Sequence, residues 1–403
     1  MMDCDPHLRG KAIIGCVRIS LHARGLLNSP LPEFVAPRPA FERQERQFAR
    51  AFAITRQAIV ERAFPGAALA ITYRGALVAA QGFGRFTYDD NSPAVQPDTV
   101  FDLASLTKVV ATTAVAMLLH ERGQLSLDEP VAQTVPEFVA LAPKHQRARR
   151  AAVTVRMLLA HSSGLPAYEK LFEFAATRQD LINAALTTRL TAAPGTRALY
   201  SDIGFIILAE LLARRAGLAI DSFAPREIFT PLGMRRTCFN PGPDLKAEIP
   251  PTEDDRRFRK RVLQGEVNDE NAYVMGGVAG HAGVFAPAVD VACFAECMLR
   301  GGSPLFSKST VKLFTRCEPS PPATTRTLGW DTPSRPHSSS GRLFSRLSFG
   351  HLGFTGTSLW IDPGRTLSVT LLTNRTWPDR APQLIRQVRP ELHDAIVEAL
   401  EES

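Results

Sequence analysis

The sequence has no apolar run long enough to cross a membrane, which as a helix takes about 20 consecutive apolar residues. Residues 1–38 also lack a signal-peptide pattern, because Lys11, Arg18 and Arg24 interrupt their apolar residues. We expect these residues to form a poorly ordered N-terminal extension. We also expect no stable membrane span and a cytoplasmic location, or a periplasmic one if the true start codon differs.

Cysteine is scarce, with six residues at positions 4, 16, 238, 293, 297 and 317. None forms Cys-x-x-Cys, and no Cys/His set has the spacing of a zinc site. Cys293 and Cys297 are one helical turn apart, which favours packing as small apolar groups. The sequence therefore predicts no metal site, and nothing in it demands an oxidising compartment.

Several catalytic and cofactor motifs are absent. Gly-x-Ser-x-Gly is missing, which argues against an α/β-hydrolase. His120-Glu121 lacks the second histidine of a zinc-protease helix, because position 124 is Gln. The glycine-rich run Asn271–Gly283 does not fit a dinucleotide fingerprint, and no phosphate loop with Gly-Lys-Ser/Thr occurs. We expect no cofactor.

Charge is modest, with a net charge of +7 and 22% charged residues beside 45% hydrophobic ones. This balance is typical of a globular protein. Basic residues gather only in short clusters at 147–150 and 256–261, without interleaved aromatic residues. Solvated loops explain such clusters better than a nucleic-acid interface, so no nucleic-acid partner is expected. A weak attraction to anionic cell-envelope polymers stays open.

β-prone segments lie at both ends of the chain, and helical patterns lie between them. A helical pattern over 40–62 precedes two short strands around a turn at Arg74-Gly75. Three more strands are predicted within 348–373, followed by a helix over 380–402. The economical fold is an α+β sandwich. One antiparallel sheet is built from both chain ends and flanked by the terminal helices, with a mostly helical insert. Residues 39–120 and 341–397 would form the α/β part, and 121–340 the insert.

The segment Ser105-Leu-Thr-Lys108 reads Ser-x-x-Lys and opens a run of good helix composition up to His120. A helix turns about every 3.6 residues, so Lys108 would lie one turn above Ser105 with its ammonium near the hydroxyl. A neighbouring lysine can remove the proton that makes serine a weak nucleophile. The free N–H groups at a helix start also favour a developing negative charge. A helix cap followed by a solvated lysine is the plainer alternative.

Two more motifs follow in order. Tyr200-Ser201-Asp202 precedes an amphipathic helix, and His351-Leu352-Gly353 lies on a predicted strand. With Ser-x-x-Lys, these motifs resemble those of the serine beta-lactamase and penicillin-binding-protein superfamily. Class C beta-lactamases, DD-carboxypeptidases and related esterases are the nearest members. The resemblance covers residues 45–395 approximately, and implies a beta-lactamase/transpeptidase-like fold and one hydrolase domain over 39–397.

The resemblance also implies roles. Ser105 would be the acylated nucleophile, and Lys108 would hold its proton network. Tyr200, as phenolate or through Lys108, would be the general base, then protonate the leaving group and activate the deacylating water. The backbone N–H groups of Ser105 and Phe354 would form the oxyanion hole. His351 would replace the usual lysine of the third motif.

Two departures from the family pattern bear on the substrate. Asp202 stands where the family usually has Asn, and a carboxylate cannot donate a hydrogen bond to a substrate carbonyl. His351 loses its charge above a pH of about 6.5 if unperturbed. Both favour an esterase or DD-carboxypeptidase, with Asp202, His351 and Gly353 binding a small-molecule or peptidoglycan-derived substrate. A true beta-lactamase and a non-catalytic binding module on the same fold stay open as alternatives.

Some residues also have structural explanations. Tyr200 could be a core tyrosine, and His351 a satisfied strand histidine. His161 and His281 are expected to hold loops through hydrogen bonds rather than to catalyse. The Pro-, Ser- and Thr-rich segment 318–340 is expected to be a long surface loop.

Overall fold

The computed structural model of the protein describes residues 34–334, 336–381 and 383–402. Most of the predicted N-terminal extension, residues 1–38, therefore lies outside the described residues. The same is true of Lys11, Arg18 and Arg24, on which the prediction of no signal peptide depends. From residue 34 onward the described chain belongs to one compact unit. Within these ranges, no helix combines the length and apolar character that a membrane span requires.

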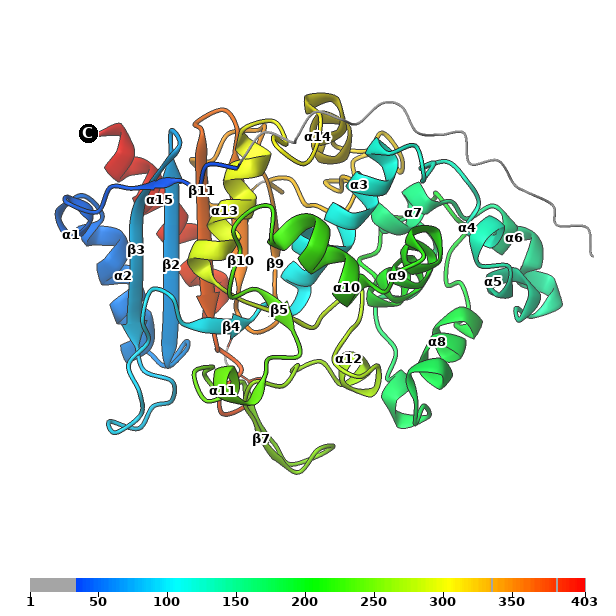
Figure 1. The fold of residues 1–403 in the computed structure, drawn as a ribbon, viewed down its shortest axis with the longest axis horizontal. Coiled ribbons are helices and arrows are strands. Elements are labelled where there is room, and N and C mark those ends of the chain that lie inside the picture. Colours follow the sequence, from blue (N-terminus) through cyan, green and yellow to red (C-terminus); the bar gives the residue numbers. More distant parts are fainter. Residues whose placement is uncertain (1–33, 335, 382, 403) are drawn as a thin grey trace, which may run out of the picture. The chain divides into compact units, whose positions relative to one another are not determined.

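A six-stranded sheet is assembled from the two ends of the chain, as the sequence predicts (Figure 1). Its strands, in spatial order, are β1 (Arg38–Pro39), β3 (Ala76–Gly84), β2 (Gly66–Tyr73), β11 (Leu367–Thr373), β10 (Ser358–Asp362) and β9 (Phe349–Leu352). The N-terminal hairpin joins the C-terminal strands where Ile71 lies opposite Val369. Neighbouring strands are antiparallel, except that the two-residue edge strand β1 runs parallel to β3. The sheet is therefore mixed at this edge.

Helices cover both faces of the sheet (Figure 1). One face carries α1 (Gln44–Gln47), α2 (Ala49–Val60) and α15 (Ile385–Glu401), and the other carries α13 (Ala288–Leu299). Side chains alternate along β2: Leu69 and Ile71 pack with α2 and α15, whereas the small Ala68 and Ala70 belong to the other core. This alternation is the period of two expected for a strand buried on both faces. The predicted helix over 40–62 is interrupted at Phe48.

The middle of the chain is mostly helical, as predicted. Its α-helices are α3 (Ala114–Glu121), α4 (Val131–Thr134), α5 (Glu137–Ala140), α6 (Arg147–Ala151), α7 (Val155–Leu159), α8 (Arg178–Thr187), α9 (Asp202–Ala216), α10 (Ile220–Ala224), α11 (Pro243–Lys246), α12 (Glu270–Val274) and α14 (Lys308–Thr315). The sequence prediction missed a small sheet of β4 (Val100–Asp102), β8 (Val284–Pro287) and β5 (Cys238–Phe239), and the hairpin β6 (Glu253–Asp255) and β7 (Arg261–Leu263). Strands of two to four residues are too short to show a clear alternation.

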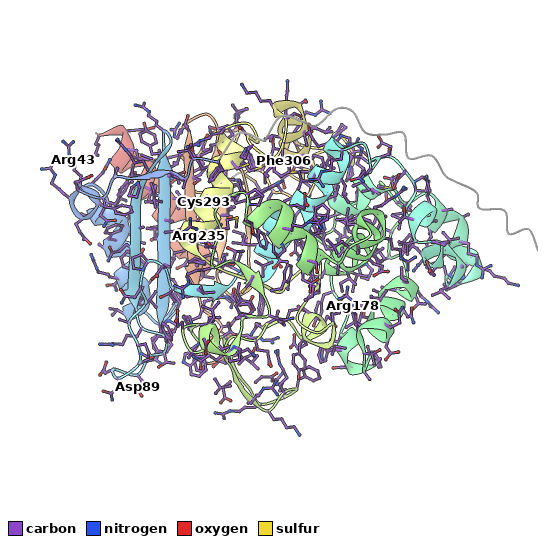
Figure 2. The ribbon with its side chains drawn as sticks, in the orientation of Figure 1. Arg43, Asp89, Arg178, Arg235, Cys293 and Phe306 are labelled. Atoms are coloured by element: carbon purple, nitrogen blue, oxygen red, sulfur yellow. The ribbon has the colours of Figure 1, made fainter. Side chains whose placement is uncertain are left out.

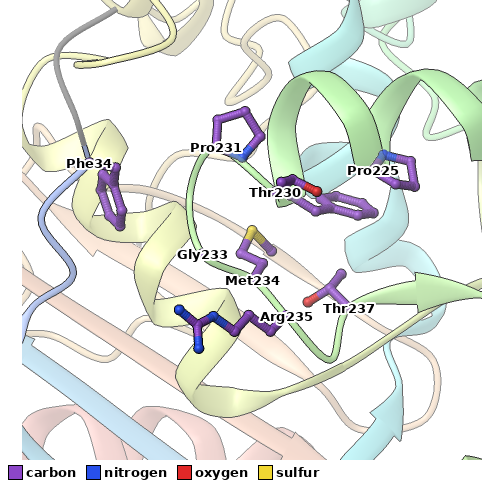
Figure 3. Close-up of a pocket in the computed structure, with 9 residues that line it drawn as sticks. Phe34, Pro225, Thr230, Pro231, Gly233, Met234, Arg235 and Thr237 are labelled. Carbon is purple, nitrogen blue, oxygen red and sulfur yellow. The ribbon is translucent and has the colours of Figure 1, made fainter.

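The described cysteines and a surface cavity lie away from the predicted site residues. Cys293 lies on α13 (Figure 2) and packs with Cys297 against the core, as predicted. No cluster of His, Cys, Asp and Glu in the described part could hold a metal ion. A cavity of about 640 Å³ lies beside Phe34, Phe229 and Met234 (Figure 3), and none of the predicted site residues lines it.

Candidate active site

The predicted nucleophile lies on a tight turn that follows β4. A single turn of 3-10 helix, Ala104–Leu106, leads into a π-helical segment, Lys108–Thr113, and then into α3. Ala104 has a φ of 47°, a left-handed conformation that non-glycine residues adopt only when their surroundings enforce it. Asp102 supplies the constraint, because its Oδ1 accepts the Ala104 N–H at 2.8 Å. Ser105 is thereby presented half-buried at the head of the helix.

Ser105 Oγ lies between the side chains of the other two predicted catalytic residues. Lys108 Nζ donates to it at 3.0 Å, and the Tyr200 hydroxyl donates to it at 2.8 Å. Tyr200 comes from the segment before α9, whose N-cap is Ser201. Residues 95 positions apart in the sequence therefore meet at one oxygen atom. These are the distances at which a proton can pass between a nucleophile and its base.

Lys108 is wholly buried, which rules out the solvated lysine of the plainer alternative. Its Nζ forms an ion pair with Asp202 Oδ1 at 2.6 Å and donates to the His281 carbonyl at 3.0 Å. Burial lowers the pKa of Lys108, because a desolvated ammonium is disfavoured, and the Asp202 carboxylate opposes this effect. Asp202 thus accepts from the lysine, and its predicted contact with the substrate stays a prediction.

Tyr200 is a phenol in the resting site. Burial is the main cause that raises its pKa well above the usual value, and the Asp202 charge adds to it. The Ser105 hydrogen bond and the Arg326 guanidinium, which lies 5.4 Å from the centre of the Tyr200 ring, only partly oppose this. A half-buried phenol in its neutral form can donate its proton, whereas the neutral form of Lys108 can accept one.

His351 lies on β9 with its ring 5.9 Å from the Tyr200 ring. Burial lowers the pKa of His351 well below the usual value, and the charges of Lys108 and Arg326 lower it further. The value of about 6.5 holds only for an unperturbed histidine, and this histidine is perturbed, so its ring is neutral at that pH. Its Nδ1 lies 2.8 Å from the Leu352 carbonyl, so Nδ1 carries the proton. The buried Nε2 is then an acceptor that pairs with no donor of the described residues.

Gly353 and Phe354 follow β9 in a turn that faces the nucleophile. A Cβ on Gly353 would lie 1.9 Å from Thr357 Oγ1, which explains the glycine. Thr355 Oγ1 donates to the Asp102 carbonyl, and Thr357 Oγ1 donates to the Leu103 carbonyl, both at 2.9 Å. These two bonds fix this turn against the turn that carries Ser105.

The N–H groups predicted to form the oxyanion hole are available. Among the described residues, neither the Ser105 N–H nor the Phe354 N–H is paired with a protein acceptor. Thr355 and Thr357 hold the two turns that present them in one frame. The oxyanion hole stays a prediction, and donors fixed in this way would need no reorganisation to serve in one.

His161 and His281 hold backbone segments, in keeping with the sequence expectation. His161 Nδ1 accepts the Ser201 N–H at 3.0 Å, which positions the residue after Tyr200. His281 Nε2 lies 2.7 Å from Asp269 Oδ1. Asp269 is also the N-cap of α12. Burial acts to raise the pKa of Asp269, but His281 and the backbone N–H of Ala272 outweigh it and lower the pKa to about 2. The carboxylate therefore stays ionised and keeps the loop before α12 in place.

Two residues near the site were missed by the sequence prediction. Arg326 and Asp331 pair at 2.5 Å within the segment predicted to be a surface loop. That segment is anchored rather than free, because Trp330 is buried and Asp331 exchanges two backbone hydrogen bonds with Gly350 of β9. The buried tryptophan in a Pro- and Ser-rich stretch was the available signal.

Comparisons with known proteins identify the family of the chain. The family model described as Beta-lactamase matches residues 41–392. A Bacillus subtilis protein named "N-acetylmuramyl-L-alanine amidase" is 34% identical over 77% of this chain and 77% of its own length. An Escherichia coli K12 protein named "Putative D-alanyl-D-alanine carboxypeptidase" is 32% identical over 76% of each chain.

Solved structures share the fold at low sequence identity. The hydrolase EstCE1 superposes with a TM-score of 0.73 at 20% identity, over 88% of this chain and 99% of its own. A penicillin-binding protein homologue from Pyrococcus abyssi gives 0.68 at 21% identity, over 87% and 77%. Since the family match spans most of the sequence and includes all three motifs, the chain belongs to the beta-lactamase family and is a serine hydrolase of that family.

Proposed function

We propose that the protein cleaves an ester, an amide or a D-amino-acid peptide through an acyl-enzyme on Ser105, in the manner of a DD-carboxypeptidase or esterase. The observation that carries this proposal is the position of Ser105 Oγ, 3.0 Å from Lys108 Nζ and 2.8 Å from the Tyr200 hydroxyl. Ser105 Oγ thus contacts a buried amine and a half-buried phenol at the same time.

Acylation would begin from the form of the enzyme in which the Lys108 ammonium has lost a proton to solvent, as its lowered pKa favours. Ser105 Oγ then attacks the substrate carbonyl carbon while the Ser105 proton passes to neutral Lys108 Nζ. The carbonyl oxygen becomes an oxyanion, which the N–H groups of Ser105 and Phe354 would stabilise. Collapse of this intermediate breaks the bond to the leaving group, which takes the proton of the Tyr200 phenol. The raised pKa of Tyr200 and the lowered pKa of Lys108 favour this division of roles.

Deacylation would return both protons. The Tyr200 phenolate accepts a proton from water as the water oxygen attacks the acyl carbon. Collapse of the second intermediate releases Ser105 Oγ, which takes back the proton held by Lys108. The sum is hydrolysis of the substrate to a carboxylic acid and the free alcohol or amine, with the enzyme unchanged.

The surroundings of the site favour a peptidoglycan-derived or related small substrate. Two relatives carry names of enzymes that act on such material, an amidase and a carboxypeptidase. Gly353 and neutral His351 would line the acyl-binding side, with His351 Nε2 accepting a substrate N–H. Because Asp202 is engaged by Lys108, it would position the amine rather than donate to the substrate. A peptide's terminal carboxylate would have to share Arg326 with Asp331, the residue that Arg326 already pairs with.

Replacement of Ser105 by alanine tests the proposal. Wild-type protein, Ser105→Ala and the exposed-serine control Ser126→Ala would be incubated with a p-nitrophenyl ester, a D-Ala-D-Ala peptide and a simple penicillin. Intact-protein mass spectrometry would follow adducts, and product release would follow turnover. We expect an adduct and turnover in the wild type and the control, and neither in Ser105→Ala.

The pattern across substrates separates the alternatives. Full turnover by folded Ser105→Ala would refute the proposal. Rapid release of hydrolysed penicillin would point to a true beta-lactamase. A lasting penicillin adduct with peptide cleavage would point to a DD-carboxypeptidase, and ester cleavage alone to an esterase. No adduct with any of the three would favour the non-catalytic binding module.

A further inference from the structure

A buried arginine lies behind the turn that carries Phe354. Arg389 projects from α15 and is only 5% exposed. Its Nη2 donates to the Thr357 carbonyl at 2.8 Å and to the Gly353 carbonyl at 3.2 Å. The charged groups that act most strongly on it are the guanidinium groups of Arg375 and Arg386, and no carboxylate of the described residues is among them. Arg389 is therefore a buried cation held by carbonyl oxygens.

The Gly353 carbonyl and the Phe354 N–H belong to the same peptide group. A charged donor on the carbonyl oxygen draws electron density away from the nitrogen, so the N–H becomes a stronger donor. Arg375 Nε donates to the carbonyl of Phe354 at 2.8 Å, which holds the other side of the same residue. Arg389 thus polarises the peptide group between Gly353 and Phe354, and Arg375 holds the Phe354 carbonyl in place.

A buried cation that has no carboxylate partner lowers the stability of the folded protein. Burial lowers the pKa of Arg389 to about 9, because the guanidinium has lost water without gaining a carboxylate. An apolar side chain of similar length would fill the space beneath the turn without that penalty. It could not polarise the Gly353 carbonyl.

We infer that Arg389 is a positioning residue that strengthens the Phe354 N–H as an oxyanion donor through its hydrogen bond to the Gly353 carbonyl. The inference rests on the proposed function, since it takes the Phe354 N–H as part of the oxyanion hole. It assigns a role in the chemical step to the C-terminal helix, which does not touch the nucleophile.

Arg150 provides a matched control within the same chain. It is also buried, and it donates only to carbonyl oxygens, those of Phe138, Leu186 and Thr188. Burial lowers its pKa to about 10. It lies on α6, and its acceptors lie in the helical part rather than in the turn before Phe354. A purely structural role would make variants of Arg389 and Arg150 behave alike.

The test compares Arg389→Met and Arg389→Lys with Arg150→Met and Arg150→Lys. Three quantities would be measured: the thermal midpoint, the single-turnover acylation rate with a p-nitrophenyl ester, and the affinity for an arylboronic acid whose boronate oxygen mimics the oxyanion. Loss of a whole oxyanion donor costs about 100- to 1,000-fold in rate, so weakening one should cost about 10-fold or more.

For Arg389→Met we expect this loss in both acylation rate and boronate affinity, with KM nearly unchanged. Arg389→Lys should recover part of it, since an ammonium can still donate to Gly353. The Arg150 variants should lower the thermal midpoint without slowing acylation. If Arg389→Met does not fold, Arg389→Lys alone should still show a slower acylation and a weaker boronate affinity than Arg150→Lys.

Wild-type acylation and boronate affinity in the folded Arg389 variants would overturn the inference, as would equal losses in the Arg150 variants. Failure of the wild type to form any acyl adduct would instead refute the proposed function. The two failures are therefore distinguishable.

Discussion

Replacement of Asp102 by asparagine should change how the stability of the protein depends on pH. The Asp102 carboxylate is 1% exposed and bridges two segments, accepting the Ala104 N–H at 2.8 Å and the Asn268 N–H at 2.7 Å. Burial raises its pKa from 3.8 to about 6, the two N–H groups lower it, and the charges of Asp269 and Arg259 raise and lower it respectively. Asparagine has nearly the same shape but does not titrate.

The sign follows from proton binding. Between pH 3.8 and about pH 6 the folded state holds the Asp102 proton and the unfolded state has released it. Stability contributed by this group is therefore present at low pH and is lost as pH rises through the window. A shift of about 2 pKa units corresponds to about 3 kcal/mol in the free energy of unfolding. The wild type should lose about 3 kcal/mol relative to Asp102→Asn between pH 3.5 and pH 7 approximately.

Asp102→Asn should also lower the free energy of unfolding by an amount that does not change with pH. The asparagine side chain offers one carbonyl oxygen, so its NH2 group must face either the Ala104 N–H or the Asn268 N–H. An unsatisfied buried donor costs about 1 to 3 kcal/mol at every pH. Because Ala104 precedes Ser105 in a strained conformation, Asp102→Asn should also slow acylation.

Urea unfolding of both proteins at a series of pH values measures the drift. Asp290→Asn is the control, since Asp290 is also buried with a raised pKa and accepts from the Arg236 N–H and the Thr237 hydroxyl. The control should show a drift of the same sign with unchanged acylation. A stability difference between wild type and Asp102→Asn that stays constant from pH 3.5 to pH 7 would refute the reasoning.

Two further substitutions probe the site. Asp202→Asn removes the carboxylate 2.6 Å from Lys108 Nζ and so lowers the lysine pKa further. The acidic limb of the acylation pH-rate profile should move down by about 1 to 3 units, and an unmoved limb would contradict this. Gly353→Ala places a Cβ 1.9 Å from Thr357 Oγ1 and should slow acylation by about 100-fold through displacement of the oxyanion turn. In the control Gly242→Ala the Cβ meets no atom within 4 Å, and equal rates in the two variants would argue against the turn.

Much of the fold and the site could be predicted from the sequence. Helix geometry places Ser105 and Lys108 one turn apart, whereas Tyr200 could be singled out only through the resemblance of the three ordered motifs to those of a known family. Short β-prone segments at both chain ends predicted the joined sheet, since strands at the two ends with helices between them favour one sheet built from both. The neutral state of His351 could not be predicted, since it depends on burial and on charges that come from distant segments.

The sequence prediction also missed the buried Arg389, for which the sequence holds a weaker signal. Along α15 the buried positions Ile385, Val388, Leu392 and Ile396 form an apolar stripe, and Arg389 and His393 lie within that stripe. A cation on the apolar face of a helix is costly unless it has a specific partner, so its presence indicated a buried acceptor. The sequence could not identify that acceptor, because Gly353 and Thr357 reach Arg389 only through the packing of α15 on the sheet.

The frame of the site therefore comes from parts of the chain that take no direct part in the proposed reaction. Asp102 holds the turn before Ser105, and Arg389 holds the turn before Phe354. Thr355 and Thr357 tie the first turn to the second. Since an oxyanion hole acts by the relative position of its donors, damage to any of these ties should slow acylation more than it weakens substrate binding.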